Sequence, residues 1–155
     1  MSGARPILLA DDDAQDVELL LIAFRHAGVR ARVHVVSDGA AALDYLYRRT
    51  AFADREAGIP AALVVDLKMP KVDGLEVLRA VRADPALASL PVIVMSASAE
   101  QSDRLATHRA GADAYVVKPM SLPEYISKVK LLARFWGPAA ELPSEGSPER
   151  DRKAP

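Results

Sequence analysis

Four aspartates in this sequence of 155 residues directly follow apolar runs. Asp66 comes after the run Ala61–Val65. Asp11–Asp13 come after the run Pro6–Ala10. Apolar runs this short, bounded by turn residues, predict strands that are buried on both faces of a parallel sheet. Open α/β sheets bind ligands in the crevice at the carboxyl ends of their strands, so neighbouring strands here would crowd four carboxylates into one pocket.

The chemistry of such a pocket requires a cation, because carboxylates at close range raise one another's pKa. A hard divalent ion with oxygen ligands relieves the repulsion, and Mg²⁺ suits a site that also handles phosphate. Two further polar residues, Ser96 and Lys118, end later apolar runs. A carboxylate attacks phosphorus in aspartyl-phosphate chemistry, an ammonium contacts the phosphoryl oxygens, and a hydroxyl donates a hydrogen bond to them. The set predicts a phosphoryl-acceptor site.

The elements that must position these residues alternate regularly along the chain. Apolar runs predict strands at 7–10, 32–36, 62–66, 91–96 and 114–117. Apolar stripes at helical spacing predict a helix after each strand: 17–28, 39–48, 75–84, 100–110 and 122–132. Because each crossover must be right-handed and cover the sheet, the predicted fold class is α/β, a (βα)5 doubly wound parallel sheet.

Two stretches depart from this alternation. Residues 49–60 form a polar connection that contains glycine and proline, and we expect a surface excursion there. From 137 onward the composition turns to Pro, Ser, Glu and Arg without an apolar period, which predicts disorder, above all in 144–155. The expected organisation is one domain at 5–136 and a partly disordered extension at 137–155.

The composition narrows the classes of function. The chain has no cysteine, which excludes disulfides, thiolate metal sites and cysteine nucleophiles. A net charge of -1 gives no general attraction for nucleic acid. No apolar segment is long enough for a secretory signal or a membrane span. We therefore expect a cytoplasmic protein that binds neither nucleic acid nor membrane.

Four motifs follow the predicted strands in order: LADDD at 9–13, DLKMPKVDG at 66–74, MSA at 95–97 and YVVKP at 115–119. In their order and spacing, these motifs resemble the receiver domain of two-component response regulators. The resemblance covers about residues 5–136 and implies the flavodoxin-like receiver fold with strand order 2-1-3-4-5. It implies a phosphoacceptor that takes a phosphoryl group from a sensor histidine kinase and catalyses only its own phosphorylation and dephosphorylation. Since no DNA-binding domain is expected, output runs through protein contacts or phosphorelay.

The resemblance assigns the acidic residues. Asp66 becomes the phosphorylation site, and Asp12 becomes a direct Mg²⁺ ligand. Asp11 belongs to the outer shell of the metal, and the backbone carbonyl of Lys68 supplies another ligand. The side chain of Lys68 is either idle and exposed or a modulator of hydrolysis.

The resemblance also assigns the remaining polar residues. Ser96 and Lys118 contact the phosphoryl group, and the Lys118–Pro119 bond is expected to be cis. Ser96 moves toward the phosphoryl oxygens on phosphorylation, which lets Tyr115 turn inward as a switch. The alternative for Tyr115 is an aromatic that simply packs on the last strand. Asp13 is favoured as a helix N-cap instead of a site residue.

A narrower likeness is carried by DYLYRR at 44–49, followed by a long loop, and by RFW at 134–136. These segments are similar to single-domain regulators paired with phytochrome-type sensor kinases, so a bacteriophytochrome is the expected kinase. We also expect a homodimer held by the last helix and the segment after it. The interface residues are predicted to be Tyr125, Leu132, Phe135 and Trp136. Packing of Phe135 and Trp136 onto their own domain is an equally open alternative.

Two other functions fit parts of the pattern. A phosphohydrolase with an aspartate nucleophile commonly has a second aspartate as general acid two positions later. That position holds Lys68, which is a poor acid at neutral pH. A degenerate receiver that only binds partners is expected to have lost Asp66, Lys118 or the acidic pair, and this sequence keeps them all.

Overall fold

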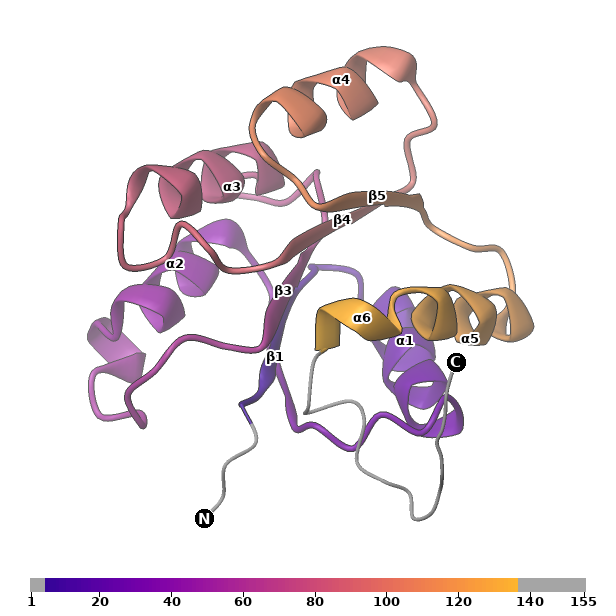
Figure 1. Cartoon of the computed structure of the whole chain (residues 1–155), viewed down its shortest axis with the longest axis horizontal. Helices are drawn as coiled ribbons and strands as arrows, with labels where there is room; N and C mark the ends of the chain where they lie inside the picture. The colour runs from indigo at the N-terminus through magenta and orange to yellow at the C-terminus, as the bar shows by residue number, and fades with distance from the viewer. Residues whose placement is uncertain (1–4, 137–155) are drawn as a thin grey trace.

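The computed structural model describes residues 5–136 of the chain, and these residues form one parallel sheet flanked by helices (Figure 1). Its five strands stand in the order β2-β1-β3-β4-β5. They are β1 (Ile7–Ala10), β2 (Val33–Val36), β3 (Ala62–Val65), β4 (Val92–Ser96) and β5 (Ala114–Val117). The predicted α/β class and strand order are therefore confirmed. Every residue of β1, β3 and β4 is buried, as their uninterrupted apolar sequences require.

The helices follow the strands as the apolar stripes predict. They are α1 (Ala14–His26), α2 (Gly39–Tyr47), α3 (Gly74–Ala83), α4 (Gln101–Arg109), α5 (Leu122–Leu131) and the short α6 (Ala133–Trp136), and η1 (Thr50–Phe52) is a 3-10 helix. Side chains of Asp13, Asp38, Asp73 and Ser121 cap the N-termini of α1, α2, α3 and α5 by accepting backbone N–H bonds. The last predicted helix corresponds to α5, and a single residue, Leu132, separates it from α6.

Two apolar cores lie on the opposite faces of the sheet. Alternate residues of β1 point to opposite faces, with Ile7 and Leu9 in one core and Leu8 and Ala10 in the other. The first core is covered by α1, α5 and α6, and the second by α2 and α3 (Figure 1). The layers hold the carboxyl ends of the strands in fixed register, and this edge of the sheet carries the polar residues described below.

The connection at 49–60 is an ordered excursion organised by Arg55. The guanidinium of Arg55 donates to the backbone oxygens of Tyr45, Glu56 and Gly58, and it lies 4.2 Å from the centre of the Tyr45 ring. The ring of Phe52 packs edge-on against the same tyrosine, 5.2 Å between centres. The long loop is thereby attached to α2 by hydrogen bonds and by aromatic contacts.

The end of the chain as described is part of the core. Trp136 is 1% exposed, its indole N–H donates to the oxygen of Val129, and Tyr125 and Leu132 are buried with it. Three of the predicted interface residues, Tyr125, Leu132 and Trp136, are therefore covered within the domain, because α5 and α6 pack on the first core. Phe135 is half-buried against the same core. Packing onto the chain's own domain is the alternative that the structure supports.

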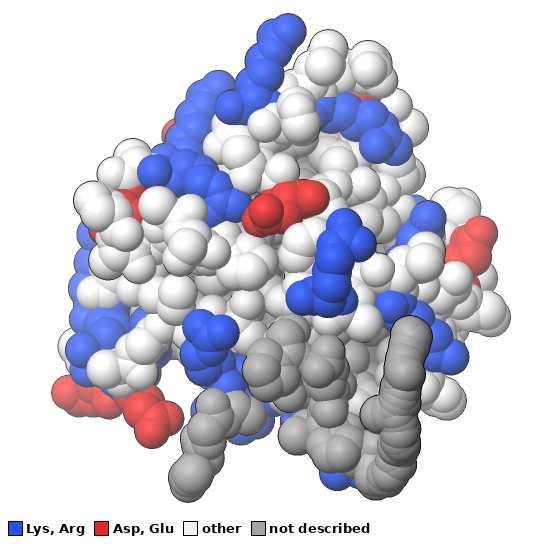
Figure 2. All heavy atoms as spheres, viewed as in Figure 1, with Lys and Arg blue, Asp and Glu red and all other residues white. Residues whose placement is uncertain are grey.

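The face of the molecule shown in Figure 2 carries both acidic and basic side chains. The basic side chains on the face shown in Figure 2 are separated by uncharged and acidic residues. Among residues 5–136, no helix is both long and apolar enough to cross a bilayer. The predicted extension at 137–155 lies outside the described residues.

Candidate functional site

The predicted acidic cluster forms because β1 and β3 are neighbours in register. Ala10 pairs with Val65, so the residues that follow each strand, Asp11 and Asp66, emerge side by side. The backbone N–H of Asp66 donates to the oxygen of Ala10 at 2.9 Å, which fixes the two strand ends relative to each other. One oxygen from each of Asp11, Asp12 and Asp66 lies within 4.8 Å of the others. The sequence-predicted carboxylates are thus brought together.

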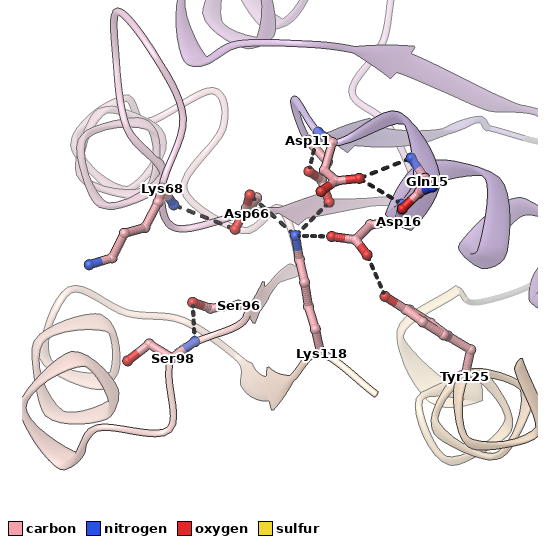
Figure 3. A network of polar contacts seen from close by, with 10 residues as sticks. Asp11, Gln15, Asp16, Asp66, Lys68, Ser96, Ser98, Lys118 and Tyr125 are labelled. Atoms are coloured by element: carbon pink, nitrogen blue, oxygen red, sulfur yellow. Dashed lines mark hydrogen bonds and ion pairs between the residues drawn. The ribbon is translucent and has the colours of Figure 1, made fainter. Parts of the chain in front are cut away.

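Lys118 points from the end of β5 into this cluster (Figure 3). Its ammonium lies 3.3 Å from the carboxylate of Asp66 and 3.1 Å from that of Asp11. The side chains of Asp66 and Asp11 are each 8% exposed and that of Lys118 is 11% exposed, so these ion pairs are largely screened from water. A positive charge therefore stands next to the oxygens of the predicted phosphoacceptor.

Ser96 closes the pocket on the β4 side. It is 1% exposed, and its hydroxyl accepts the backbone N–H of Ser98 at 3.1 Å. Asp66, Ser96 and Lys118 line one cavity of about 510 Å³ beside the loop that follows β4. This space lies next to the acceptor carboxylate and is where a phosphoryl group has room.

Tyr115 lies on β5 beyond this loop. Its ring is half-buried against the second core, and its hydroxyl donates to the backbone oxygen of Ser98 at 2.8 Å. The guanidinium of Arg104 lies 5.0 Å from the centre of the ring. Ser96 and Tyr115 therefore both hydrogen-bond to Ser98, one through its backbone N–H and the other through its backbone oxygen.

The loop after Asp66 is held close to the site by α3. The side chains of Asp73 and Glu76 form a reciprocal capping box at the start of this helix. A Cβ on Gly74 would collide with the backbone oxygen of Asp66, so glycine is required for this close approach. The backbone N–H of Lys68 points to Asp66 at 3.5 Å, whereas its side chain extends away from the carboxylates (Figure 3).

Burial and charge shift the titration of the site. Burial, opposed by the Lys118 charge and assisted by Asp11, raises the pKa of Asp66 to about 6. Burial alone would lower the pKa of Lys118, but the hydrogen bond to Asp16 and the charges of Asp11 and Asp66 outweigh it and raise that pKa. Lys118 is therefore an ammonium at neutral pH, and Asp66 is mostly a carboxylate.

The donor set fits a divalent cation. Carboxylate oxygens are the ligands that hard cations such as Mg²⁺ and Mn²⁺ prefer, and three acidic residues offer them within a few ångströms. A single lysine leaves the cluster of Asp11, Asp12 and Asp66 with excess negative charge, which burial of Asp11 and Asp66 makes costly. Both observations favour occupancy by a metal.

Of two further predictions next to the site, one agrees with the structure and one does not. Asp13 caps α1 by accepting the N–H bonds of Gln15 and Asp16, as favoured. The predicted cis Lys118–Pro119 bond is wrong, because residues 5–136 contain no cis peptide, in keeping with the ordinary preference for trans.

Asp16 is a residue that sequence reasoning missed. Its carboxylate lies 2.8 Å from the Lys118 ammonium and 3.4 Å from the hydroxyl of Tyr125 (Figure 3). An acidic residue in the first turn of a helix is ordinarily explained by the helix dipole. No local signal in the sequence distinguishes Asp16 from an ordinary acidic residue of a first helical turn.

Comparisons with known proteins agree with this geometry. The family model for the response regulator receiver domain matches residues 7–130. The probable methanogenesis regulatory protein FilR2 of Methanothrix harundinacea is 32% identical, over 84% of this chain and 82% of its own length. The transcriptional regulatory protein PrrA of Mycobacterium tuberculosis is 39% identical over 90% of this chain, but the match spans only 54% of PrrA.

Solved structures place the chain beside phytochrome-associated regulators. The bacteriophytochrome response regulator RtBRR is 43% identical with a TM-score of 0.75, covering 87% of this chain and 79% of its own. The phosphorylated cyanobacterial phytochrome response regulator RcpA is 32% identical with a TM-score of 0.79, covering 92% and 100%.

A metal-bound structure is among these neighbours. The Mn²⁺-bound form of response regulator Rcp1 is 25% identical with a TM-score of 0.77, covering 92% and 99% of the two chains. Receiver domains bind a divalent metal at their acidic pocket and are phosphorylated by sensor histidine kinases. By the family match, by its fold and by the arrangement of its strand-end residues, this chain belongs to the response regulator receiver domain family of two-component systems.

Proposed function

We propose that this protein is a phosphoacceptor that receives a phosphoryl group on Asp66 from a sensor histidine kinase. The observation that carries the proposal is the convergence of Asp11, Asp12 and Asp66 within 4.8 Å, with the Lys118 ammonium 3.3 Å from Asp66. The cavity shared by Asp66, Ser96 and Lys118 leaves space for the transferred group beside its acceptor. The receiver domain is proposed to comprise residues 5–136.

The transfer is a substitution at phosphorus. An oxygen of the Asp66 carboxylate attacks the phosphorus of a phosphohistidine, and the new O–P bond forms as the N–P bond breaks. The electron pair of the broken bond leaves on the histidine nitrogen, which takes up a proton. Lys118 contacts the phosphoryl oxygens, and Ser96 donates its hydroxyl to one of them. In dephosphorylation, water attacks the phosphorus, the O–P bond to Asp66 breaks and its electron pair returns to the Asp66 carboxylate, while the proton of the water leaves to solvent as inorganic phosphate is released.

The proposed cofactor is Mg²⁺, held by Asp12, Asp66 and the backbone carbonyl of Lys68, with Asp11 in the outer shell. When bound, the ion supplies positive charge that neutralises the phosphoryl oxygens. The close carboxylates of this chain and the Mn²⁺-bound form of Rcp1 support a divalent ion at this place. Mg²⁺ is proposed because it is commonly bound through one or two carboxylates together with substrate phosphate oxygens.

The protein is proposed to signal through protein contacts or through phosphorelay. It is proposed to act in the cytoplasm, where histidine kinases are phosphorylated from ATP. The likeness to RtBRR and RcpA favours a bacteriophytochrome as the kinase. Tyr115 is the proposed switch: movement of Ser96 toward the phosphoryl group changes the loop whose Ser98 oxygen accepts the Tyr115 hydroxyl. Self-association as a homodimer is proposed as well, through exposed residues of α5 since Trp136 is buried.

The test is phosphorylation by acetyl phosphate with Mg²⁺. Intact mass spectrometry is expected to show one added phosphoryl group on the wild-type protein and none on Asp66→Asn. Exposed Asp54, outside the site, gives the matched control Asp54→Asn, which should be labelled like wild type. Persistent labelling of Asp66→Asn, or no labelling of wild type with any acyl phosphate or phosphoramidate donor, would contradict the proposal.

A further inference from the structure

The carboxylate of Asp16 joins three elements at the edge of the site. Asp16 lies in the first turn of α1, and one of its oxygens accepts from the Lys118 ammonium at the end of β5. Its other oxygen accepts from the hydroxyl of Tyr125 on α5 at 3.4 Å. The 2.8 Å contact with Asp16 is shorter than the contacts of Lys118 with Asp11 and Asp66, 3.1 and 3.3 Å. Asp16 is thus the nearest acceptor for Lys118.

The donors of Lys118 limit what the ammonium can do. An ammonium has three N–H donors, and Asp11, Asp16 and Asp66 each accept one contact from it. Phosphoryl transfer converts the Asp66 carboxylate into a carboxyl phosphate, and Asp11 belongs to the surroundings of the metal. Of the three acceptors, Asp16 is therefore the one that neither the metal nor the transferred group uses.

We propose that Asp16 is a positioning residue that holds the Lys118 ammonium beside Asp66, where it contacts the phosphoryl group. This inference rests on the proposed phosphoacceptor function and deepens it. Lysine carries its charge on a flexible four-carbon side chain, and ordering that side chain costs conformational entropy. A fixed partner keeps the side chain ordered before the phosphoryl group arrives, so this cost does not add to the barrier of transfer. Preorganised charge accelerates a reaction because little rearrangement remains at the moment of transfer.

Asp16 is itself held in place from two sides. Its backbone N–H donates to the capping carboxylate of Asp13 at 3.1 Å, which fixes the first turn of α1. Tyr125 is 1% exposed, and burial together with the nearby Asp16 charge raises its pKa to about 12. The hydroxyl therefore stays protonated at neutral pH and donates to Asp16. A carboxylate fixed in this way can orient a longer and more flexible side chain.

The first experiment compares initial rates of phosphorylation by acetyl phosphate at saturating Mg²⁺. Asp16→Ala is expected to be roughly 3- to 10-fold slower than wild type, as for the loss of one hydrogen bond of typical net strength. Asp16→Asn should lie between the two, because its amide oxygen still accepts from Lys118. Glu18 is an exposed carboxylate of the same helix, and Glu18→Gln is the matched control for lost charge.

The pattern among these variants separates positioning from charge and from folding. Equal slowing by Asp16→Asn and Asp16→Ala, or slowing by Glu18→Gln, would mean that negative charge alone matters and would overturn the proposal. Circular dichroism establishes that each variant is folded. Tyr125→Phe keeps the ring and removes the hydroxyl, so a smaller slowing in the same direction is expected.

A second experiment asks without metal whether Asp16 acts through Lys118. Urea unfolding in EDTA is measured for wild type, Asp16→Asn, Lys118→Met and the double variant. The expected result is non-additivity: Asp16→Asn lowers the urea midpoint in the wild-type background and lowers it less, or raises it, in Lys118→Met. Identical shifts in both backgrounds would show no coupling between the two residues and would overturn the proposal.

Failure of this inference is distinguishable from failure of the proposed function. If wild type is labelled on Asp66 and Asp16→Ala is labelled at the same rate, only the positioning role is wrong. If the label persists in Asp66→Asn, the phosphoacceptor assignment fails first, and the positioning role fails with it. Persistence of the urea coupling in that case would leave Asp16 and Lys118 as a structural ion pair.

Discussion

The ring of Trp136 packs edge-on against the ring of Phe24, with 5.1 Å between ring centres and 74° between ring planes. This contact joins the last helical turn of the described chain to α1 and closes the first core. Trp136→Ala is expected to lower the free energy of unfolding by about 3–5 kcal/mol, because it leaves a cavity in a buried aromatic pair. Urea unfolding measures the change. A loss below about 1 kcal/mol would contradict the structural role.

Exposed Leu131 offers a test of self-association. It is 67% exposed on α5, next to the residues that the sequence favoured for a homodimer. Leu131→Asp is expected to shift a homodimer toward monomer while changing the free energy of unfolding by less than about 0.5 kcal/mol, as for most surface substitutions. Light scattering over a range of concentrations, with and without acetyl phosphate, gives the mass. A wild type that is monomeric throughout refutes the homodimer, and a dimer unaffected by Leu131→Asp refutes this surface.

Asp12 and Asp13 allow a test of the metal site in which Asp13 is the control. Both are exposed carboxylates in adjacent positions, but only Asp12 contributes an oxygen to the cluster with Asp11 and Asp66. Asp12→Ala is expected to weaken Mg²⁺ binding by more than about tenfold and to slow phosphorylation with it. Asp13→Ala removes a helix cap and is expected to lower stability by about 1 kcal/mol with little effect on Mg²⁺ affinity. Equal Mg²⁺ titrations for wild type and Asp12→Ala would contradict the assignment.

The raised pKa of Asp66 makes the metal-free protein sensitive to pH. The folded value is about 6 and the ordinary value is 3.8, so between them the folded state binds more protons than the unfolded state. Stability therefore falls as pH rises through this window and stays low above it. We expect the free energy of unfolding of metal-free Asp66→Asn to be higher than that of wild type by about 1–2 kcal/mol at pH 7, and by less near pH 4. Urea unfolding in EDTA at both pH values, with Asp54→Asn as control, checks this; an advantage that grows toward pH 4 would contradict it.

Tyr115 provides a test of the loop after β4. Tyr115→Phe removes the hydroxyl that donates to the Ser98 oxygen and is expected to lower the free energy of unfolding by about 1 kcal/mol. Backbone amides of residues 97–100 should exchange hydrogen faster in this variant. Tyr47→Phe is the control, since within residues 5–136 its hydroxyl has no described hydrogen bond. Unchanged exchange in Tyr115→Phe would show that the hydroxyl does not hold the loop.

Much of the fold and of the site follows from local features of the sequence. The run Ala61–Val65 is apolar without interruption, which only a strand covered on both faces tolerates, and its end places Asp66 at the edge of the sheet. The same reasoning places Asp11 and Asp12 after β1. Once two such strands are parallel neighbours, convergence of their terminal carboxylates is a geometric consequence, so the cluster was predictable before any packing was known.

The tertiary structure decided the contacts between distant elements. Asp16 meets Lys118 across 102 positions and Tyr125 across 109 positions of the chain, and no local pattern encodes either contact. The sequence leaves equally open whether Trp136 faces a partner or its own core, and in the structure it packs against Phe24 in the first core. The period of an apolar stripe indicates which face of a helix is buried. The distance and angle between two packed helices depend on how all the side chains between them fit together.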